Sequence, residues 1–370
     1  MSIKIPVYKP FFNGNERKYV DECIESTWIS SRGKYVTLFE QSFADYIGVK
    51  YSVAVTNGTA AIHLALLSLG VGPGDEVIVP SLTYIASVNP IRYVGATPIF
   101  ADSDEITWQI DPEDVKRRIT NRTKAIIAVH LYGHPADMRS IMQIAREKGV
   151  FVIEDCAEAI GTEFEGRRVG SFGDIACFSF FGNKTITTGE GGMLLSNDKT
   201  IISRSVSLKG QGLAMHREYW HDMIGYNYRM TNICAAIGYA QMETVDIVIE
   251  KKRNIAITYK EMLRDTEVSL FVGNDGNEGI LNTYWMCTIQ IEKEGELRDS
   301  LRKYLLDNGI ETRPVFYPVH TMPIYARQYQ KLPVAESIGW RGINLPSFPD
   351  LTEDEIKYVV GKIKEFYGGK

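Results

Sequence analysis

Short apolar runs alternate with longer amphipathic stretches between about residue 50 and residue 154. Apolar runs of four or five residues are typical of buried parallel strands, whereas apolar residues three and four positions apart are typical of helices. This alternation predicts an α/β fold with a mostly parallel sheet and helices on its faces. The predicted strands are residues 52–55, 76–79, 98–101, 125–129 and 150–154, and the predicted helices are residues 60–69, 85–94, 112–119 and 138–147.

The pattern changes after residue 154. Residues 175–180 and 192–196 each have the character of a strand, yet only a loop separates them. Two such strands joined without a helix do not occur in a simple doubly wound fold, because parallel neighbours need a long crossover. We therefore expect a mixed sheet in which most strands are parallel.

A long helical stretch over residues 232–263 is a natural bridge between two domains. It is followed by a strand at residues 285–291, a helix at 296–308, a proline-rich loop at 313–323 and a last helix at 353–366. The predicted organisation is a large domain at residues 1–250 and a smaller C-terminal α+β domain at residues 251–370.

Composition removes several classes of function. The net charge is −5 and no Lys/Arg-rich block is present, which argues against nucleic acid or anionic lipid as a partner. The five cysteines are scattered without CxxC spacing and the six histidines show no ligand spacing, so no disulfide framework and no metal site are expected. No apolar segment suits a signal peptide or a membrane span, which predicts a cytoplasmic enzyme.

Lys184 and Asp155 each follow an apolar run that reads as a buried strand. Ligands of α/β proteins bind at the carboxyl ends of such strands. Pyridoxal phosphate needs a lysine for its Schiff base and an acid beside its ring nitrogen, so the pair predicts this cofactor. The ordinary alternatives are a surface lysine and an aspartate that caps a helix.

The chain also offers a phosphate site and a ring-stacking residue. Gly58 and Thr59 stand between a predicted strand and a helix, where free N–H groups and the helix dipole favour an anion. Ser179 adds a second hydroxyl near the Lys184 loop. Tyr84 follows another strand end and can stack on an aromatic ring. A plain capped turn and a core-facing tyrosine are the simpler readings of these residues.

Together these segments resemble the DegT-type family of nucleotide-sugar aminotransferases, which have the aspartate-aminotransferase fold (fold type I of the pyridoxal-phosphate enzymes). The resemblance covers nearly the whole chain and implies a large domain with a mostly parallel mixed sheet plus a smaller C-terminal α+β domain. The segments that carry it are residues 28–31, 33–36, 57–61, 154–157, 171–174, 189–192, 225–231 and 313–320.

The resemblance implies a role for each cofactor-binding residue. Lys184 would form the Schiff base and Asp155 would pair with the ring nitrogen. The phosphate would be held by Gly58, Thr59 and Ser179, together with Asn227 from a neighbouring subunit, and Tyr84 would stack on the ring. The protein would therefore be a homodimer, or a dimer of dimers, with shared active sites.

Glu158 stands where many members of the wider family carry histidine or glutamine, and its expected contact is the ring hydroxyl of the cofactor. The expected substrate-binding residues are Ser31, Arg229, Arg313 and His320.

Residues 130–135 and 180–184 are most similar to family members that aminate C4 of GDP-4-keto-6-deoxymannose with L-glutamate. The resemblance therefore implies a pyridoxal-phosphate-dependent aminotransferase that makes a sugar for O-antigen. Lys184 argues against the branch of the family that carries histidine at this position and performs a 3-dehydration.

Three other functions stay open. The nearest is an aminotransferase that acts on a UDP- or dTDP-linked keto sugar. A non-catalytic cofactor-binding sensor is disfavoured because no basic patch or DNA-binding helix pair is evident. An NAD-dependent sugar dehydratase is disfavoured because no GxGxxG motif follows an early strand.

Overall fold

A seven-stranded sheet forms the centre of the larger part of the molecule, in the order β1-β9-β8-β5-β4-β2-β3. β9 is antiparallel to both of its neighbours, while the other strands run in one direction. The expected mostly parallel, mixed sheet is therefore confirmed. The strands are β1 (Tyr51–Val55), β2 (Glu76–Pro80), β3 (Thr97–Ala101), β4 (Thr123–Val129), β5 (Phe151–Asp155), β8 (Ile175–Ser179) and β9 (Gly192–Ser196).

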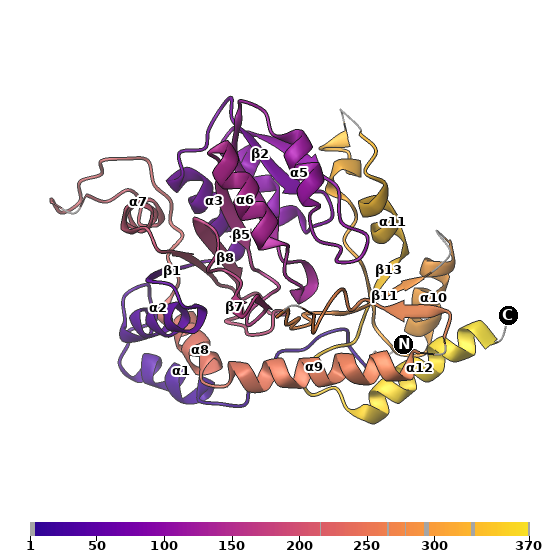
Figure 1. The fold of residues 1–370 in the computed structure, drawn as a ribbon. Helices are drawn as coiled ribbons and strands as arrows, with labels where there is room; N and C mark the ends of the chain where they lie inside the picture. The colour runs from indigo at the N-terminus through magenta and orange to yellow at the C-terminus, as the bar shows by residue number, and fades with distance from the viewer. Residues whose placement is uncertain are drawn as a thin grey trace.

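This computed structural model describes residues 4–214, 216–264, 266–277, 279–291, 296–326 and 330–368. Helices cover both faces of the large sheet (Figure 1). One face packs against α3 (Gly58–Ser68), α4 (Asn89–Tyr93) and α7 (Lys199–Lys209), and the other against α2 (Lys34–Ile47), α5 (Pro112–Arg118), α6 (Met138–Lys148) and α8 (Asn232–Met242).

α3 lies deepest of these helices. Most of its side chains are buried between the sheet and α7, which is why its sequence is apolar on every side. Asn57 caps it, since its side chain accepts a hydrogen bond from the Ala60 N–H at 2.8 Å. The cap fixes where the helix begins, and it begins at Gly58.

The long helical stretch predicted at residues 232–263 is two helices. α8 ends at Met242 and α9 (Val245–Met262) starts after Thr244. The N–H groups of Glu243 and Thr244 bond to carbonyls three residues earlier, which tightens the chain and turns it. The apolar pattern runs through this turn, so periodicity did not reveal it.

A second, four-stranded antiparallel sheet has the order β10-β11-β13-β12. Its strands are β10 (Val268–Leu270), β11 (Cys287–Ile291), β12 (Arg313–Pro314) and β13 (Gly342–Leu345), and its neighbours include α9, α10 (Glu296–Asp307), α11 (Pro333–Arg341) and α12 (Glu353–Gly368). The smaller elements are α1 (Glu16–Glu25), β6 (Glu163–Phe164), β7 (Arg167–Arg168) and the 3₁₀ turns η1 (Ile85–Ser87), η2 (Leu131–Gly133) and η3 (Val319–Thr321).

α9 spans both parts of the molecule (Figure 1). Val245 and Ile249 pack in the core beneath α2, whereas Ile255 and Tyr259 pack in the core of the small sheet. The chain before α1 also reaches the small sheet, where Ile5 pairs with Ile310. A domain division at residue 250 therefore stays a prediction, since it falls inside a continuous helix.

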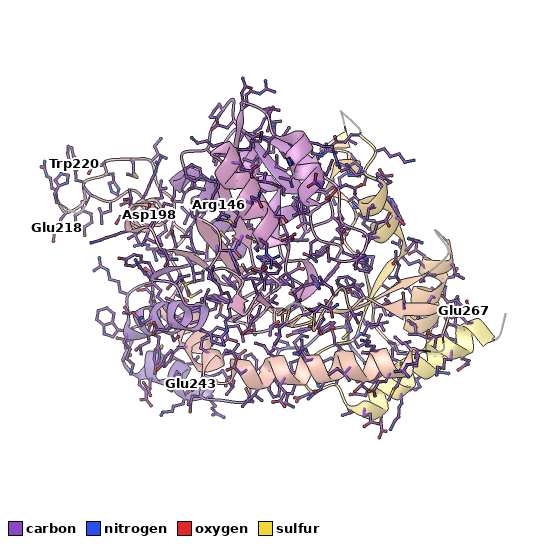
Figure 2. All side chains as sticks on the ribbon, in the orientation of Figure 1. Arg146, Asp198, Glu218, Trp220, Glu243 and Glu267 are labelled. Atoms are coloured by element: carbon purple, nitrogen blue, oxygen red, sulfur yellow. The ribbon has the colours of Figure 1, made fainter. Side chains whose placement is uncertain are left out.

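A loop between α7 and α8 extends away from the body of the protein. Glu218 and Trp220 lie near its tip, at the left edge of the view in Figure 2. A bridge between Leu213 and His221 holds its two arms together. Tyr219 is 92% exposed and Ile224 is 86% exposed, which is unusual for apolar side chains of this size. Among the described helices, none combines the length and the hydropathy that a membrane span requires.

Candidate active site

The predicted cofactor residues gather at one edge of the large sheet. Gly58 follows β1, Asp155 ends β5, Ser179 ends β8, Tyr84 follows β2, and Lys184 lies in the loop after β8. The parallel strands all end at this edge, so segments far apart in sequence meet there. Lys184 and Asp155 therefore lie at the carboxyl edge of the sheet, where the sequence placed them.

Asp155 is buried, and its carboxylate is held in a fixed orientation. One oxygen accepts a hydrogen bond from the Ser87 hydroxyl at 2.7 Å, and the other accepts one from the Ala157 N–H at 3.1 Å. The Ser87 hydroxyl in turn lies 2.8 Å from that of Thr83. A carboxylate accepts up to four hydrogen bonds, so each oxygen keeps room for a further donor.

Lys184 lies between an acidic and an aromatic side chain. Its Nζ is 3.8 Å from Oε1 of Glu158 and 3.8 Å from the centre of the Trp285 ring, and its side chain is 13% exposed. Burial lowers the pKa of the Lys184 amine, while the charges of Glu158 and Asp155 act in the opposite direction. A lowered pKa supplies the neutral amine that a nucleophilic lysine needs.

The backbone on either side of this amine is also fixed. The Tyr8 hydroxyl donates to the Lys184 carbonyl at 2.7 Å, and the Trp285 indole N–H donates to the Asn183 carbonyl at 2.7 Å. These two donors come from the N-terminal segment and from the chain before β11. The Lys184 loop is therefore held by parts of the chain that lie far from it in sequence.

Glu158 faces Lys184 from the turn after β5. Its Oε2 accepts a hydrogen bond from the Tyr132 N–H at 2.8 Å. Burial raises the pKa of Glu158 to about 7, although Lys184 and the Tyr132 N–H act to lower it. The Glu158 carboxyl group thus lies beside the Lys184 amine. Its expected contact with the ring hydroxyl of the cofactor stays a prediction.

Two backbone segments approach each other closely where the phosphate site is expected. A Cβ atom on Gly58 would lie 2.8 Å from the Cβ of Ser179, and one on Gly192 would lie 2.5 Å from the carbonyl carbon of Asn57. Only glycine fits at these two positions. The first turn of α3, which includes Thr59, therefore reaches Ser179 with N–H groups that have no partner inside the helix.

Tyr84 lies on the open side of the site. Its side chain is 56% exposed, and its ring centre is 5.5 Å from that of Phe316. Phe316 belongs to an aromatic stack that continues through Tyr132 to Trp285. Tyr84 is therefore an exposed platform, not a core residue, and can meet a flat ring.

The predicted residues Asn227 and Arg229 lie in an exposed segment beside the end of β1. The side-chain oxygen of Asn227 accepts a 3.4 Å hydrogen bond from Arg229, and Arg229 bridges to Val55. Ser31 belongs to another exposed segment, which Asn232 fastens through hydrogen bonds to the carbonyls of residues 28 and 30. Whether a second subunit brings these residues to the site stays a prediction.

The two remaining predicted substrate residues have partners of their own. Arg313 pairs with Glu311 at 2.8 Å on the surface. His320 is buried, with Nδ1 2.6 Å from the Ser81 hydroxyl and Nε2 3.2 Å from Glu336. Burial lowers the pKa of His320, although Glu336 acts to raise it. In this structure His320 therefore supports the Ser81 turn, and its contact with substrate stays a prediction.

Sequence reasoning missed Trp285 and Tyr132 as neighbours of the site. Trp285 was expected only as the start of a strand, and it packs over Lys184. Tyr132 has a left-handed backbone with φ of 56°, which turns its N–H toward Glu158 and lets its carbonyl accept from the Trp285 N–H. Residues 130–135 carry part of the family resemblance, but the left-handed conformation of Tyr132 cannot be predicted from the sequence.

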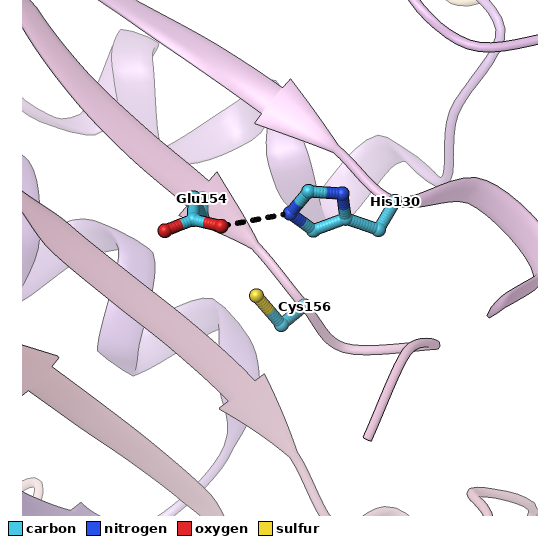
Figure 3. Close-up of side chains that lie close together, drawn as sticks. All are labelled: His130, Glu154 and Cys156. Atoms are coloured by element: carbon cyan, nitrogen blue, oxygen red, sulfur yellow. Dashed lines mark hydrogen bonds and ion pairs between the residues drawn. The ribbon is translucent and has the colours of Figure 1, made fainter. Parts of the chain in front are cut away.

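His130, Glu154 and Cys156 form a buried cluster at the end of β5 (Figure 3). Glu154 accepts hydrogen bonds from the N–H groups of residues 170, 172 and 173, and from His130 Nε2 at 3.1 Å. His130 Nδ1 accepts from the Ala136 N–H at 3.0 Å, which places the ring hydrogen on Nε2. The ligand atoms of His130 and Glu154 are thus already used, and the cluster braces β5 rather than binding a metal.

Comparison with known proteins gives a consistent result. The sequence profile of the DegT/DnrJ/EryC1/StrS aminotransferase family matches residues 11–364. GDP-perosamine synthase of Escherichia coli O157:H7 is 58% identical over 366 residues, which cover 99% of each chain. GDP-perosamine synthase of Vibrio cholerae is 49% identical, covering 98% of this chain and 99% of the relative. Spr1654 of Streptococcus pneumoniae, solved in a PLP form, superposes with a TM-score of 0.93 at 26% identity, covering 99% of both chains.

Proposed function

The chain belongs to the DegT/DnrJ/EryC1/StrS aminotransferase family, and we propose that it transfers the amino group of L-glutamate to C4 of GDP-4-keto-6-deoxymannose, giving GDP-perosamine. Membership makes it a pyridoxal-phosphate-dependent aminotransferase that uses an amino donor and a nucleotide sugar. The proposal depends chiefly on one observation: a buried lysine faces an acid at the sheet edge of a chain 58% identical to a GDP-perosamine synthase.

The residues at the sheet edge fit pyridoxal phosphate. Asp155 would pair with its ring nitrogen, and Lys184 would hold it covalently. The glycine-lined first turn of α3 and Ser179 would hold its phosphate, since the space between them admits no Cβ. When bound, the cofactor carries the amino group between the two substrates and withdraws electrons from the reacting carbon.

Lys184 supplies the acid–base chemistry. Its amine can take the α-proton of glutamate and later return a proton at C4 of the sugar, because a group of lowered pKa is effective in both directions near neutral pH. Trp285 covers the amine on one side, and the ring limits the access of water. The carbonyls of residues 183 and 184 are hydrogen-bonded, which keeps the amine in place.

We infer that the active form is a homodimer, or a dimer of dimers, in which Asn227 of one subunit reaches the phosphate site of the other. The projecting residues 216–224 support this, because the exposed Tyr219 and Ile224 are the kind of side chains that a partner surface covers. The exposed Trp28 and Ile29 near Ser31 support it in the same way. Arg229 would then face substrate phosphates.

A panel of keto sugars tests the substrate. The protein is incubated with glutamate and GDP-, UDP- or dTDP-linked 4-keto-6-deoxy sugars, and the products are identified by mass spectrometry. The GDP-linked sugar should gain an amino group at a rate at least ten times that of the others. An equal or higher rate with a UDP- or dTDP-linked sugar would replace the proposed substrate with the nearest alternative, while amination of none would favour a sensor.

A further inference from the structure

Glu158 is a buried carboxyl group with few partners. It accepts one backbone hydrogen bond, from Tyr132, and its other oxygen lies 3.8 Å from the Lys184 amine. A fully buried carboxylate normally gathers several donors, as Glu154 does four residues earlier. The surroundings of Glu158 therefore do not favour a permanent negative charge.

The pKa values of Lys184 and Glu158 are also shifted toward each other. The Lys184 pKa is lowered and the Glu158 pKa is raised to about 7, so the energies of the charged pair and the neutral pair approach each other. Among the described residues, Asp155 is the other ionisable group that acts on Glu158, and the Glu158 charge in turn acts to raise the pKa of the Tyr132 phenol. The Asp155 charge adds to the tendency of Glu158 to keep a proton.

The Lys184 ammonium must lose a proton before its amine can bond to an aldehyde, and the amine must again be neutral whenever it acts as a base. The proton needs an acceptor near a side chain that is largely shielded from solvent. Glu158 is the one acidic side chain of the described residues within 4.0 Å of the Lys184 Nζ. Asp155 is directed elsewhere, toward Ser87 and the Ala157 N–H.

We propose that Glu158 is the proton-exchange partner of Lys184. A proton moves from the Lys184 ammonium to the Glu158 carboxylate, which leaves a neutral amine and a neutral acid, and the reverse transfer restores the charged pair. Nothing else is gained or lost in this step. The inference rests on the proposed function only for the role of Lys184, and it gives Glu158 a task that neither glutamine nor a mere hydrogen-bond acceptor can perform.

The test compares Glu158→Gln with wild type. Glutamine keeps the size of the side chain and can still accept from the Tyr132 N–H, but it carries no charge and takes no proton. The full-length protein freed of cofactor is labelled with cyanate over a range of pH, and the carbamylated Lys184 peptide is measured by mass spectrometry. Without the carboxylate, the Lys184 pKa should fall by about one unit.

Activity gives the second readout. In the cofactor-loaded protein, Glu158→Gln should lower kcat at least about tenfold with a smaller change in KM, and Glu158→Asp should recover part of the loss. Glu267→Gln is the matched control, because Glu267 is exposed beside the small sheet, far from the site (Figure 2). It should leave both the labelling curve and kcat unchanged.

Two results would overturn the inference. An unchanged labelling curve in Glu158→Gln would show that Glu158 does not govern the charge of Lys184. A shifted curve with unchanged kcat would show that no proton passes between them. Both differ from failure of the proposed function, in which wild type itself aminates no keto sugar while the Lys184 labelling curve can still be measured.

Discussion

Glu154 and Glu158 are both buried acids, four residues apart, yet their environments differ sharply. Burial acts to raise the pKa of Glu154, but hydrogen bonds from His130 and from the N–H groups of Gly173 and Gly170 outweigh it and lower the pKa. Glu158 has one N–H donor and one amine, and burial raises its pKa to about 7. The number of donors decides which acid keeps its charge.

The two acids therefore do different work. Glu154 holds the turn at residues 170–173 against β5, and with it the position of Asp155 at the end of that strand. Glu158 has no such set of backbone partners and faces the reactive amine instead. A fixed charge suits a structural role, whereas a charge that can change suits proton transfer. Substitutions at Glu154 and its turn should therefore change stability, whereas substitutions at Glu158 and Lys184 should change the reaction rate.

The largest effect is expected for Lys184→Ala. This change removes the amine that faces Glu158. Both half-reactions should slow at least about 10³-fold, because the Lys184 amine serves as base and as acid in each. The measurement is single-turnover conversion of glutamate and, separately, of the keto sugar. Turnover within tenfold of wild type would refute the role of Lys184. The melting temperature should stay close to that of wild type.

Glu154→Gln should lower the stability of the protein, in contrast to Lys184→Ala, which should lower only its activity. An amide cannot accept from His130 and three N–H groups at once, so buried donors lose their partner. We expect the free energy of unfolding to fall by about 3 kcal/mol, measured by urea denaturation of the cofactor-free protein. Glu267→Gln, an exposed acid, should change it by less than about 0.5 kcal/mol. Equal stability of the two variants would mean that the bonds to Glu154 add little.

Gly173→Ala should weaken the same support by a smaller amount. A Cβ at residue 173 would lie 2.8 Å from the Val152 carbonyl oxygen and 3.4 Å from Cγ of Glu154, so the turn must shift. The expected loss is about 1–3 kcal/mol in the free energy of unfolding. Gly182→Ala is a suitable control, because nothing lies within 4 Å of its added Cβ. An equal loss of unfolding free energy in Gly182→Ala would show that the clash at residue 173 does not account for the effect.

The smallest effect is expected in the pH dependence of stability. Because the folded state holds the Glu158 proton up to about pH 7 and the unfolded state releases it near 4.5, stability from this group falls as pH rises through that window. Glu158→Gln should remove this slope, which amounts to roughly 1 kcal/mol for each pH unit between pH 5 and pH 7. Glu154 has the reverse sign, since its lowered pKa makes its contribution disappear only as the medium becomes strongly acidic. Melting curves of both variants, measured from strongly acidic pH up to pH 8, provide the check.

Much of the fold was predictable because its signals are local. Each of the strands β1 to β5 could be predicted from its own apolar run, without knowledge of the other segments. The residues that follow such runs could be identified in the same way, which is why Lys184 and Asp155 were predicted. Ser87 and Trp285 could not be, because their roles arise only when distant segments meet. The turn between α8 and α9 was missed because the apolar pattern continues through it. The contribution of Asn227 depends on a second chain and stays a prediction.

The N-terminal segment has a consequence for how the protein matures. Val7 donates its N–H to Glu311, 304 positions later in sequence, and its carbonyl accepts from the Ser347 N–H. Figure 1 shows the N-terminus beside α12 and not near α1. The adjoining Tyr8 can therefore reach the Lys184 loop in its native position only after nearly the whole polypeptide has left the ribosome. Such distant pairings slow folding, so this enzyme should gain its activity in one late event after synthesis and not by degrees.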